Sequence, residues 1–213
     1  MSSCAPRNIV LVGFMGAGTS TVGQLLAESL RMPLVDTDAL VESRTGVSIA
    51  RLFATQGERA FRTIEASVVQ EVTQGRGQVI ATGGGAVADA SSLECMLAGN
   101  LVVWLTAPLD VLVERAQRQG QRPLLESAAD LQQLFKERVQ YYAQAHLAVS
   151  AEAAPERIAE TIGAYWEMAR RGGMRMRSVS VHVNDRTYPI HVGTDLLRRS
   201  HELIPLAPTR ALL

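Results

Sequence analysis

The sequence has few cysteines, few aromatic residues and no net charge. Its 213 residues include only Cys4 and Cys95, which cannot form a disulfide framework and lack the spacing of metal ligands. Aromatic residues make up 5% of the chain, and 21 basic residues balance 21 acidic ones, so no global field draws the protein to nucleic acid or to a membrane surface. With 47% hydrophobic and 20% charged residues, the composition excludes a disordered or fibrous chain.

Long apolar runs are also missing, and lysine is rare. No segment approaches the ~18 apolar residues of a membrane span, and the amino terminus shows no charged region followed by an apolar stretch and a cleavage site. We therefore expect a cytoplasmic protein with no nucleic-acid or membrane partner. Twenty of the basic residues are arginine, and Lys136 is the single lysine.

Short β-branched and aliphatic runs alternate with helical patterns along most of the chain. Strands are predicted at 8–12, 34–35, 79–81, 101–105 and 147–149. Helices are predicted at 20–31, 38–56, 58–74, 89–98, from 108, 130–145 and 155–170, with breaks at Gly46 and Gly57. Buried strands that alternate with helices form parallel βαβ units, so we expect an α/β sandwich.

The pattern changes after Arg170. Residues 171–173 are typical of a linker, and 178–183 and 187–192 alternate like a hairpin around Asn184 and Asp185. Because a lone hairpin is not independently stable, this tail is either an appendage at a sheet edge or the start of a second domain.

A glycine-rich segment, GFMGAGTST at 13–21, follows the first predicted strand and opens a helix. This arrangement is typical of a phosphate-binding loop, with Ser20 where a hydroxyl would ligate Mg²⁺; a plain glycine-rich turn is the alternative. In such loops a lysine normally follows the last glycine. Here that position is Thr19, whose side chain has no charge. Losing one such preorganised group typically costs about 10²–10³ in rate. Lys136 or an arginine near 118–122 would have to replace it.

Polar and glycine residues follow the second and third strands, at the sheet edge where ligands of open parallel sheets bind. We expect Asp36 and Asp38 on the same side of an extended segment. There, one can serve a metal and the other can accept a proton from a substrate hydroxyl. The alternative is that Asp38 only caps a helix. The triplet at 83–85 indicates either a close approach or a simple turn.

Five arginines are candidates for binding anions. Arg62 and Arg138 lie on predicted helices and, taken singly, are more typical of solvated charges. Arg115, Arg118 and Arg122 cluster around the polar loop 119–127. An arginine-bearing loop near a phosphate site can clamp the transferred group, because guanidinium pairs oxygens bidentately.

Taken together, these residues resemble the shikimate kinase family. The motifs, in order, are GFMGAG-x-ST (13–21), VDTD (35–38), GE-x-x-FR (57–62), ATGGG (81–85), R-x-x-x-RPLL (118–125) and ER-x-x-YY (137–142). The resemblance covers residues 8–165. It implies a three-layer α/β sandwich with a five-stranded parallel sheet, of the P-loop nucleoside-monophosphate-kinase type. It further implies a monomeric kinase domain that uses ATP and Mg²⁺ to phosphorylate the 3-hydroxyl of shikimate, in chorismate and aromatic amino acid biosynthesis.

The resemblance also implies a role for each motif residue. The nucleotide would be bound by Gly13, Gly16, Ala17, Gly18, Thr19, Ser20, Thr21, Arg118, Arg122 and Pro155. Magnesium would be held by Ser20 and Asp36. Shikimate would be bound by Asp38, Arg62, Gly83, Gly84, Gly85 and Arg138. The catalytic groups would be Asp38, which takes the proton, and Arg122, the lid arginine on the phosphates.

The sequence departs from the family at Thr19, at Gln140, where proline is common, and in its tail. Residues 179–197 resemble the opening of 3-dehydroquinate synthase. We therefore expect a kinase domain at 1–170, a linker at 171–177 and the truncated start of a synthase-like domain at 178–213, as in a kinase–synthase fusion. Two other functions stay open: a pseudokinase module that binds shikimate or nucleotide with little turnover, and a kinase for another polyol acid such as gluconate.

Overall fold

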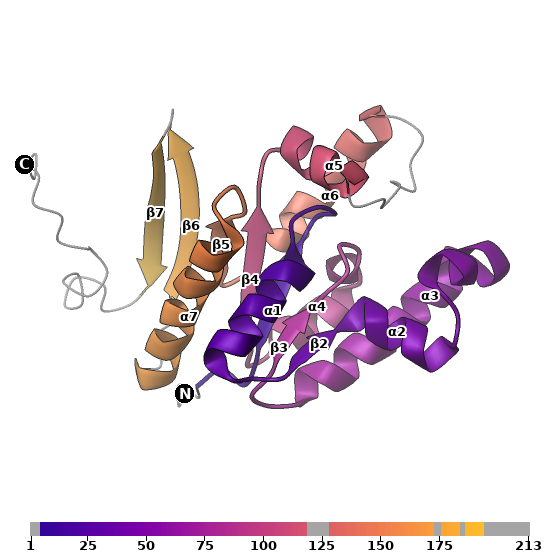
Figure 1. The fold of residues 1–213 in the computed structure, drawn as a ribbon, viewed down its shortest axis with the longest axis horizontal. Helices are drawn as coiled ribbons and strands as arrows, with labels where there is room; N and C mark the ends of the chain where they lie inside the picture. The colour runs from indigo at the N-terminus through magenta and orange to yellow at the C-terminus, as the bar shows by residue number, and fades with distance from the viewer. Residues whose placement is uncertain (1–4, 119–127, 173–175, 184–185, 194–213) are drawn as a thin grey trace, which may run out of the picture.

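The computed structural model describes residues 5–118, 128–172, 176–183 and 186–193 (Figure 1). The strands are β1 (Ile9–Gly13), β2 (Leu34–Asp36), β3 (Val79–Ala81), β4 (Leu101–Thr106), β5 (Leu147–Ser150), β6 (Met176–Val183) and β7 (Arg186–Gly193). The α-helices are α1 (Thr19–Leu30), α2 (Thr37–Thr45), α3 (Ile49–Gln74), α4 (Ala90–Leu97), α5 (Leu109–Arg118), α6 (Ala128–Tyr142) and α7 (Pro155–Gly172). A short 3-10 helix, η1, covers Ala86–Ala88.

The strands form one sheet in the order β2-β3-β1-β4-β5-β6-β7. The first five are mutually parallel, with Ile9 in register with both Val79 and Leu101, and Val103 opposite Leu147. All five residues of β1 are buried, as expected for an apolar central strand of a parallel sheet. The five-stranded parallel sheet expected from the sequence is confirmed.

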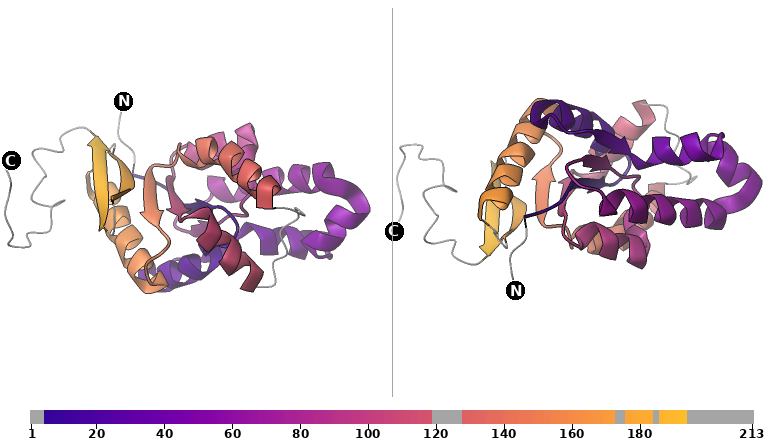
Figure 2. Two further views of the ribbon diagram at one scale, coloured as in Figure 1. Left: turned by 90° about the horizontal axis from the view of Figure 1, so that it is seen from above. Right: turned by 90° about the horizontal axis from the view of Figure 1, so that it is seen from below.

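Helices cover both faces of this sheet, which gives the three layers (Figures 1 and 2). Helices α1 and α7 lie side by side on one face, and α3 packs against α4 on the other. Helices α2 and α3 project at the end of the molecule opposite the β6–β7 hairpin. The predicted breaks at Gly46 and Gly57 are confirmed. Gly46 ends α2 with a φ of 69°, and Gly57 interrupts α3 with a φ of 80°, a left-handed conformation that favours glycine.

The predicted hairpin is also confirmed, and it extends the sheet. Strand β6 pairs with β5 in parallel, with Ser178 opposite Leu147, and β7 pairs with β6 in antiparallel fashion. Helix α7 continues to Gly172 before β6 begins at Met176. The hairpin therefore lies at the edge of the sheet, whereas a synthase-like second domain stays a prediction. No helix within the described ranges is both long and apolar enough to cross a bilayer.

A buried amide just before β1 ties together the bottom of the sheet. Asn8 is fully buried, and its Nδ2 donates to the carbonyl oxygen of Gly75 at 2.8 Å and to Oδ1 of Asn100 at 2.9 Å. Its Oδ1 accepts from the backbone N–H of Gln78 at 3.3 Å. One side chain thus connects the end of α3 with the starts of β1, β3 and β4.

We expect Asn8→Ala to lower the free energy of unfolding by about 2–3 kcal/mol, because it leaves several buried polar groups without a partner. Urea denaturation at pH 7 measures this. As a control, Gln24→Ala on the exposed side of α1 should change the free energy of unfolding by less than about 0.5 kcal/mol. Equal effects of the two substitutions would contradict a structural role for Asn8.

Candidate active site

The glycine-rich segment 13–21 forms a tight loop between β1 and α1. Gly16 and Gly18 have φ values of 76° and 86°, and Gly18 is the N-cap of α1. Gly16 has no space for a side chain, because a Cβ there would overlap the carbonyl of Leu112 in α5. The loop leads directly into the start of α1. The first N–H groups of a helix have no partners within the helix, so they are free to bind a phosphate group.

Beside this loop, Ser20 and Asp36 form a direct hydrogen bond. Ser20 Oγ donates to Oδ2 of Asp36 at 2.7 Å. The other oxygen, Oδ1, accepts from the backbone N–H groups of Asp38 and Ala39 at 3.0 and 3.1 Å. A hydroxyl and a carboxylate at a phosphate loop are the hard oxygen donors that suit Mg²⁺. Among the described residues, no group of three or more His, Cys, Asp or Glu could hold a metal ion.

These contacts correct two expectations about the aspartates. The residue that caps α2 is Asp36 and not Asp38, because β2 ends at Asp36 and the chain turns directly into the helix. For the same reason Asp38 lies in the first turn of α2, so the extended segment expected at 36–38 is wrong. The two carboxylates still lie close together, since Asp36 contributes to the shifted pKa of Asp38.

Each glycine of the 83–85 turn contacts a different part of the site. A Cβ on Gly83 would lie 2.5 Å from Oδ1 of Asp38, and one on Gly85 would lie 2.6 Å from Cζ of Arg62. A Cβ on Gly84 would lie 3.1 Å from the carbonyl oxygen of Gly13 in the phosphate loop. These contacts support the close-approach interpretation of the triplet, and Gly84 and Gly85 also form a turn.

Asp38 is a buried acid with an unused oxygen. Its Oδ1 is buried and has no hydrogen-bond partner in the part of the chain that the structure describes. Burial, together with the negative charges of Glu65 and Asp36, raises the pKa of Asp38 from 3.8 to about 6, and Arg62 partly opposes this shift. Such a carboxylate is ready to accept a hydrogen bond or a proton.

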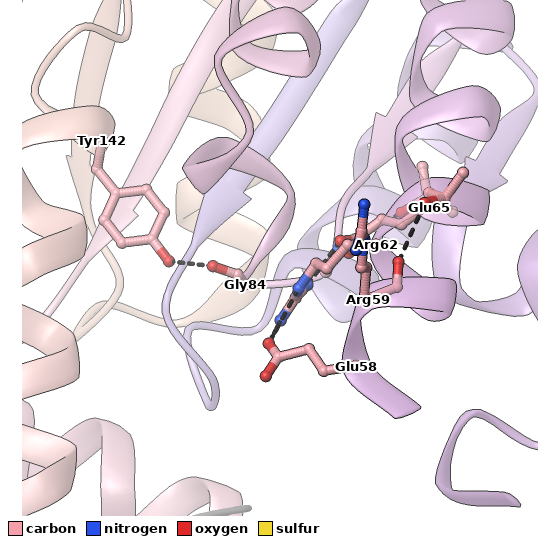
Figure 3. A network of polar contacts seen from close by, with 9 residues as sticks. Glu58, Arg59, Arg62, Glu65, Gly84 and Tyr142 are labelled. Carbon is pink, nitrogen blue, oxygen red and sulfur yellow. Dashed lines mark hydrogen bonds and ion pairs between the residues drawn. The ribbon is translucent and has the colours of Figure 1, made fainter. Parts of the chain in front are cut away.

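The guanidinium of Arg62 is held by two carboxylates (Figure 3). Its Nη1 pairs with Oε2 of Glu65 at 2.6 Å, and its Nη2 with Oε1 of Glu58 at 3.1 Å. Burial raises the pKa of Glu65, while Arg62 and Arg138 lower it, so both arginines lie near this carboxylate. Sequence reasoning did not single out Glu65, although its spacing of three from Arg62 on one helix is a usable signal.

Arg138 completes this group of charges from α6. Its Cζ lies 5.9 Å from the centre of the Phe14 ring, and its Nε is buried without a hydrogen-bond partner among the described residues. The structure thus brings Asp38, Arg62, Arg138 and the glycine turn together beside the phosphate loop. The sequence spacing alone does not place these residues next to one another.

The residues expected to bind the adenine and the outer phosphates, so far as they are described, lie on two separate helices. Arg118 is exposed on α5 and pairs with Glu114 at 2.6 Å, and Pro155 is the first residue of α7. Arg122 lies outside the described residues. Arg115 donates from Nη1 to the carbonyl oxygen of Ala151 at 2.7 Å.

Among the described residues, neither Lys136 nor Arg118 takes the place of the lysine that Thr19 replaces, and the remaining candidate, Arg122, lies outside the described residues. Thr19 Oγ1 lies 3.5 Å from the carbonyl oxygen of Thr82, at the limit of a hydrogen bond. Lys136 is exposed on α6. The described part of the loop therefore presents backbone amides and hydroxyls to a phosphate.

A glycine-rich loop between a central parallel strand and a helix, with a serine–aspartate pair at its base, is the nucleotide site of a P-loop phosphotransferase. Next to it lies a cluster of two arginines and one carboxylate of raised pKa, which suits a small hydroxylated acid as the phosphate acceptor.

The comparisons identify the family. Residues 15–166 match the family model described as shikimate kinase. The shikimate kinase of Synechococcus elongatus is 44% identical over 152 residues, which is 70% of this chain and 80% of that protein. That of Symbiobacterium thermophilum is 48% identical over 143 residues, or 65% and 82%. A solved shikimate kinase from Acinetobacter baumannii in complex with shikimate has a TM-score of 0.71 and 34% identity, and the match covers 78% of this chain and 96% of that one. This chain belongs to the shikimate kinase family, and the expected fold class is confirmed.

Proposed function

We propose that this chain transfers the γ-phosphate of ATP to the 3-hydroxyl of shikimate, giving shikimate 3-phosphate on the route to chorismate and the aromatic amino acids. The observation that carries the proposal is the meeting of Asp38, Arg62, Arg138 and the Gly83–Gly85 turn beside the phosphate loop. Membership of the shikimate kinase family supports it.

The acceptor is held by opposite charges at its two ends. Arg62 and Arg138 bind the shikimate carboxylate, with the backbone N–H of Gly84 as a further donor. Asp38 accepts hydrogen bonds from the shikimate hydroxyls and takes the proton of the 3-hydroxyl. The oxygen of the 3-hydroxyl attacks the γ-phosphorus, and the bond between this phosphorus and ADP breaks. With a pKa of about 6, most Asp38 carboxyls are ionised at pH 7.

On the donor side, the amides of residues 13–21 and the start of α1 hold the phosphates. Ser20, oriented by Asp36, is the side chain that would ligate Mg²⁺. When bound, the ion neutralises charge on the β- and γ-phosphates. We propose Arg122 as the arginine on the phosphates, and Arg118 and Pro155 as the adenine side.

One observation favours a second candidate, a module that binds shikimate or nucleotide with negligible turnover: Thr19 stands where a lysine charge is expected. Family membership does not support this alternative. A coupled assay with ATP, Mg²⁺ and shikimate separates the two, with gluconate as the control acceptor. The proposed function predicts shikimate-dependent ADP release and formation of shikimate 3-phosphate, whereas gluconate gives neither. Binding of shikimate without product would favour the module, and turnover of gluconate would overturn the assignment of substrate.

Gly85→Ala tests whether the glycine turn positions Arg62. The new Cβ would overlap the guanidinium, so we expect the KM for shikimate to rise about tenfold, while the KM for ATP stays within about twofold. Steady-state kinetics with each substrate varied measures both. Gly163→Ala in α7 is the matched control, because its Cβ would lie 3.8 Å from the side chains of Leu26 and Leu30, an ordinary contact. An unchanged KM for shikimate in Gly85→Ala would contradict the proposed role.

We further propose that the kinase unit, residues 1–170, acts as a monomer in the cytoplasm, and that residues 178–213 begin a 3-dehydroquinate-synthase-like unit. The linker expected at 171–177 overlaps the end of α7, at Gly172, and the start of β6, at Met176. Strand β6, which begins the tail after α7, pairs with β5 at the edge of the kinase sheet. Sedimentation velocity of the chain measures its oligomeric state.

A further inference from the structure

Tyr142, at the end of α6, makes a buried contact with the glycine turn. Its hydroxyl donates to the carbonyl oxygen of Gly84 at 2.6 Å, across 58 positions of sequence (Figure 3). The side chain is 1% exposed. Burial raises the pKa of this hydroxyl, so it remains a hydrogen-bond donor throughout the physiological range. Titration of the tyrosine therefore does not break this contact at physiological pH.

The tyrosine ring is held as firmly as its hydroxyl. It stacks on Trp104 in β4, with ring centres 5.8 Å apart and planes at 16°. Because β4 is paired on both sides, with β1 and β5, the ring rests on a fixed part of the sheet. Arg138 lies one helical turn earlier on α6 and interacts with the same hydroxyl. Tyr142 thus connects the helix that carries Arg138 with the turn that carries Gly84.

The position of Gly84 affects the charged residues around the glycine turn. On one side the carbonyl oxygen of Gly84 accepts the hydrogen bond from the tyrosine hydroxyl. On the other side the Cα of Gly84 lies against the carbonyl oxygen of Gly13 and the backbone nitrogen of Met15. Its neighbours Gly83 and Gly85 touch Asp38 and Arg62. A shift of this turn would therefore change the spacing between the two arginines and the Gly84 N–H.

We propose that Tyr142 is a positioning residue for the acceptor: its hydroxyl fixes the Gly83–Gly85 turn relative to Arg138, so that both guanidiniums and the Gly84 N–H converge on one carboxylate. This inference rests on the proposed function. The competing interpretation is a core tyrosine that only stabilises the fold. The two differ in the expected kinetics, because a purely structural residue does not change the acceptor affinity of the protein that remains folded.

Tyr142→Phe removes the hydroxyl and keeps the stacked ring. Losing one buried hydrogen bond to the turn is expected to raise the calorimetric Kd and the KM for shikimate about five- to tenfold. We expect kcat and the KM for ATP to stay within about twofold, because the donor site keeps its contacts. Tyr141→Phe, one position earlier on the same helix, is the matched control and should leave all four values within about twofold.

Trp104→Phe serves as a second variant, which keeps the tyrosine hydroxyl but weakens the ring support. It should raise the Kd for shikimate by about threefold or less. Circular dichroism checks that each variant is folded at the assay temperature. The proposal is overturned if Tyr142→Phe binds shikimate as the unaltered chain does, or if Tyr141→Phe weakens binding equally. If the unaltered chain itself binds no shikimate, the proposed function fails together with this inference.

Discussion

Thr19→Lys is expected to raise kcat for shikimate phosphorylation by a factor of about 10²–10³, corresponding to ~3–4 kcal/mol of transition-state stabilisation. A lysine at the start of α1 would place a full positive charge on the outer phosphates, where charge develops during transfer. Little is lost in exchange, because the contact of Thr19 with the Thr82 carbonyl is 3.5 Å long. The coupled assay at saturating ATP and shikimate measures the ratio.

Thr19→Gln is the control for this gain, since glutamine adds length and hydrogen-bonding groups without charge. It should leave kcat within about threefold of the unaltered chain. If glutamine raised kcat as much as lysine, charge would not be the reason. If lysine raised it by less than threefold, another cation would already serve the phosphates, and Arg122→Ala would be the next variant to assay.

Asp38→Asn is expected to lower kcat by a factor of about 10²–10⁴, because the amide cannot take the proton of the acceptor hydroxyl. The unaltered enzyme should show kcat/KM rising with pH and levelling off above about pH 6, the pKa of Asp38 in the folded state. The variant should lose this limb of the profile. Asp110→Asn, an exposed position in the first turn of α5, is the matched control and should stay within about twofold.

The same substitution should make the protein more stable above pH 6. Because the folded-state pKa of Asp38 is raised from 3.8 to about 6, the folded chain holds this proton more tightly than the unfolded chain. The resulting stabilisation is fully present below pH 3.8 and is lost as pH rises through 6. At pH 8 the ionised carboxylate then opposes folding by about 3 kcal/mol, at 1.36 kcal/mol per pKa unit.

Asparagine carries no such pH-dependent cost. We therefore expect the free energy of unfolding of Asp38→Asn, followed by urea denaturation, to exceed that of the unaltered chain at pH 8 and to approach it at pH 4. A variant that is both inactive and less stable at pH 8 would contradict the placement of Asp38 as a buried, functional acid with a raised pKa.

Much of the fold could be predicted because its signals are local. The buried run at 8–12 and the glycines at 46 and 57 determine a strand and two helix breaks within a few residues of sequence. The identity of the α2 cap could not be predicted in this way. Both Asp36 and Asp38 are good caps, and the choice depends on β2 ending at Asp36, where its pairing with Ala81 stops.

The site was predictable where it coincides with motifs and not where it depends on long-range contacts. The triplet at 83–85 leaves a close approach and a simple turn open, and only the folded chain shows that Asp38, the phosphate loop and Arg62 lie against it. Tyr142 contacts Gly84 because α6 packs against η1, which directly follows the glycine turn. Hydrophobic periodicity reports which face of a helix is buried, and it does not report the partner.

The position of β1 in the sheet has a consequence for biosynthesis. Strand β1 precedes both of its neighbours in the sequence, so it cannot pair with β3 until residues 79–81 have been translated, or with β4 until residues 101–106 have been translated. Until then the apolar segment Ile9–Val12 is exposed in an unfinished chain and is a target for chaperones and for aggregation. Slowing translation before β4 should therefore reduce the yield of native enzyme more than slowing it after β5.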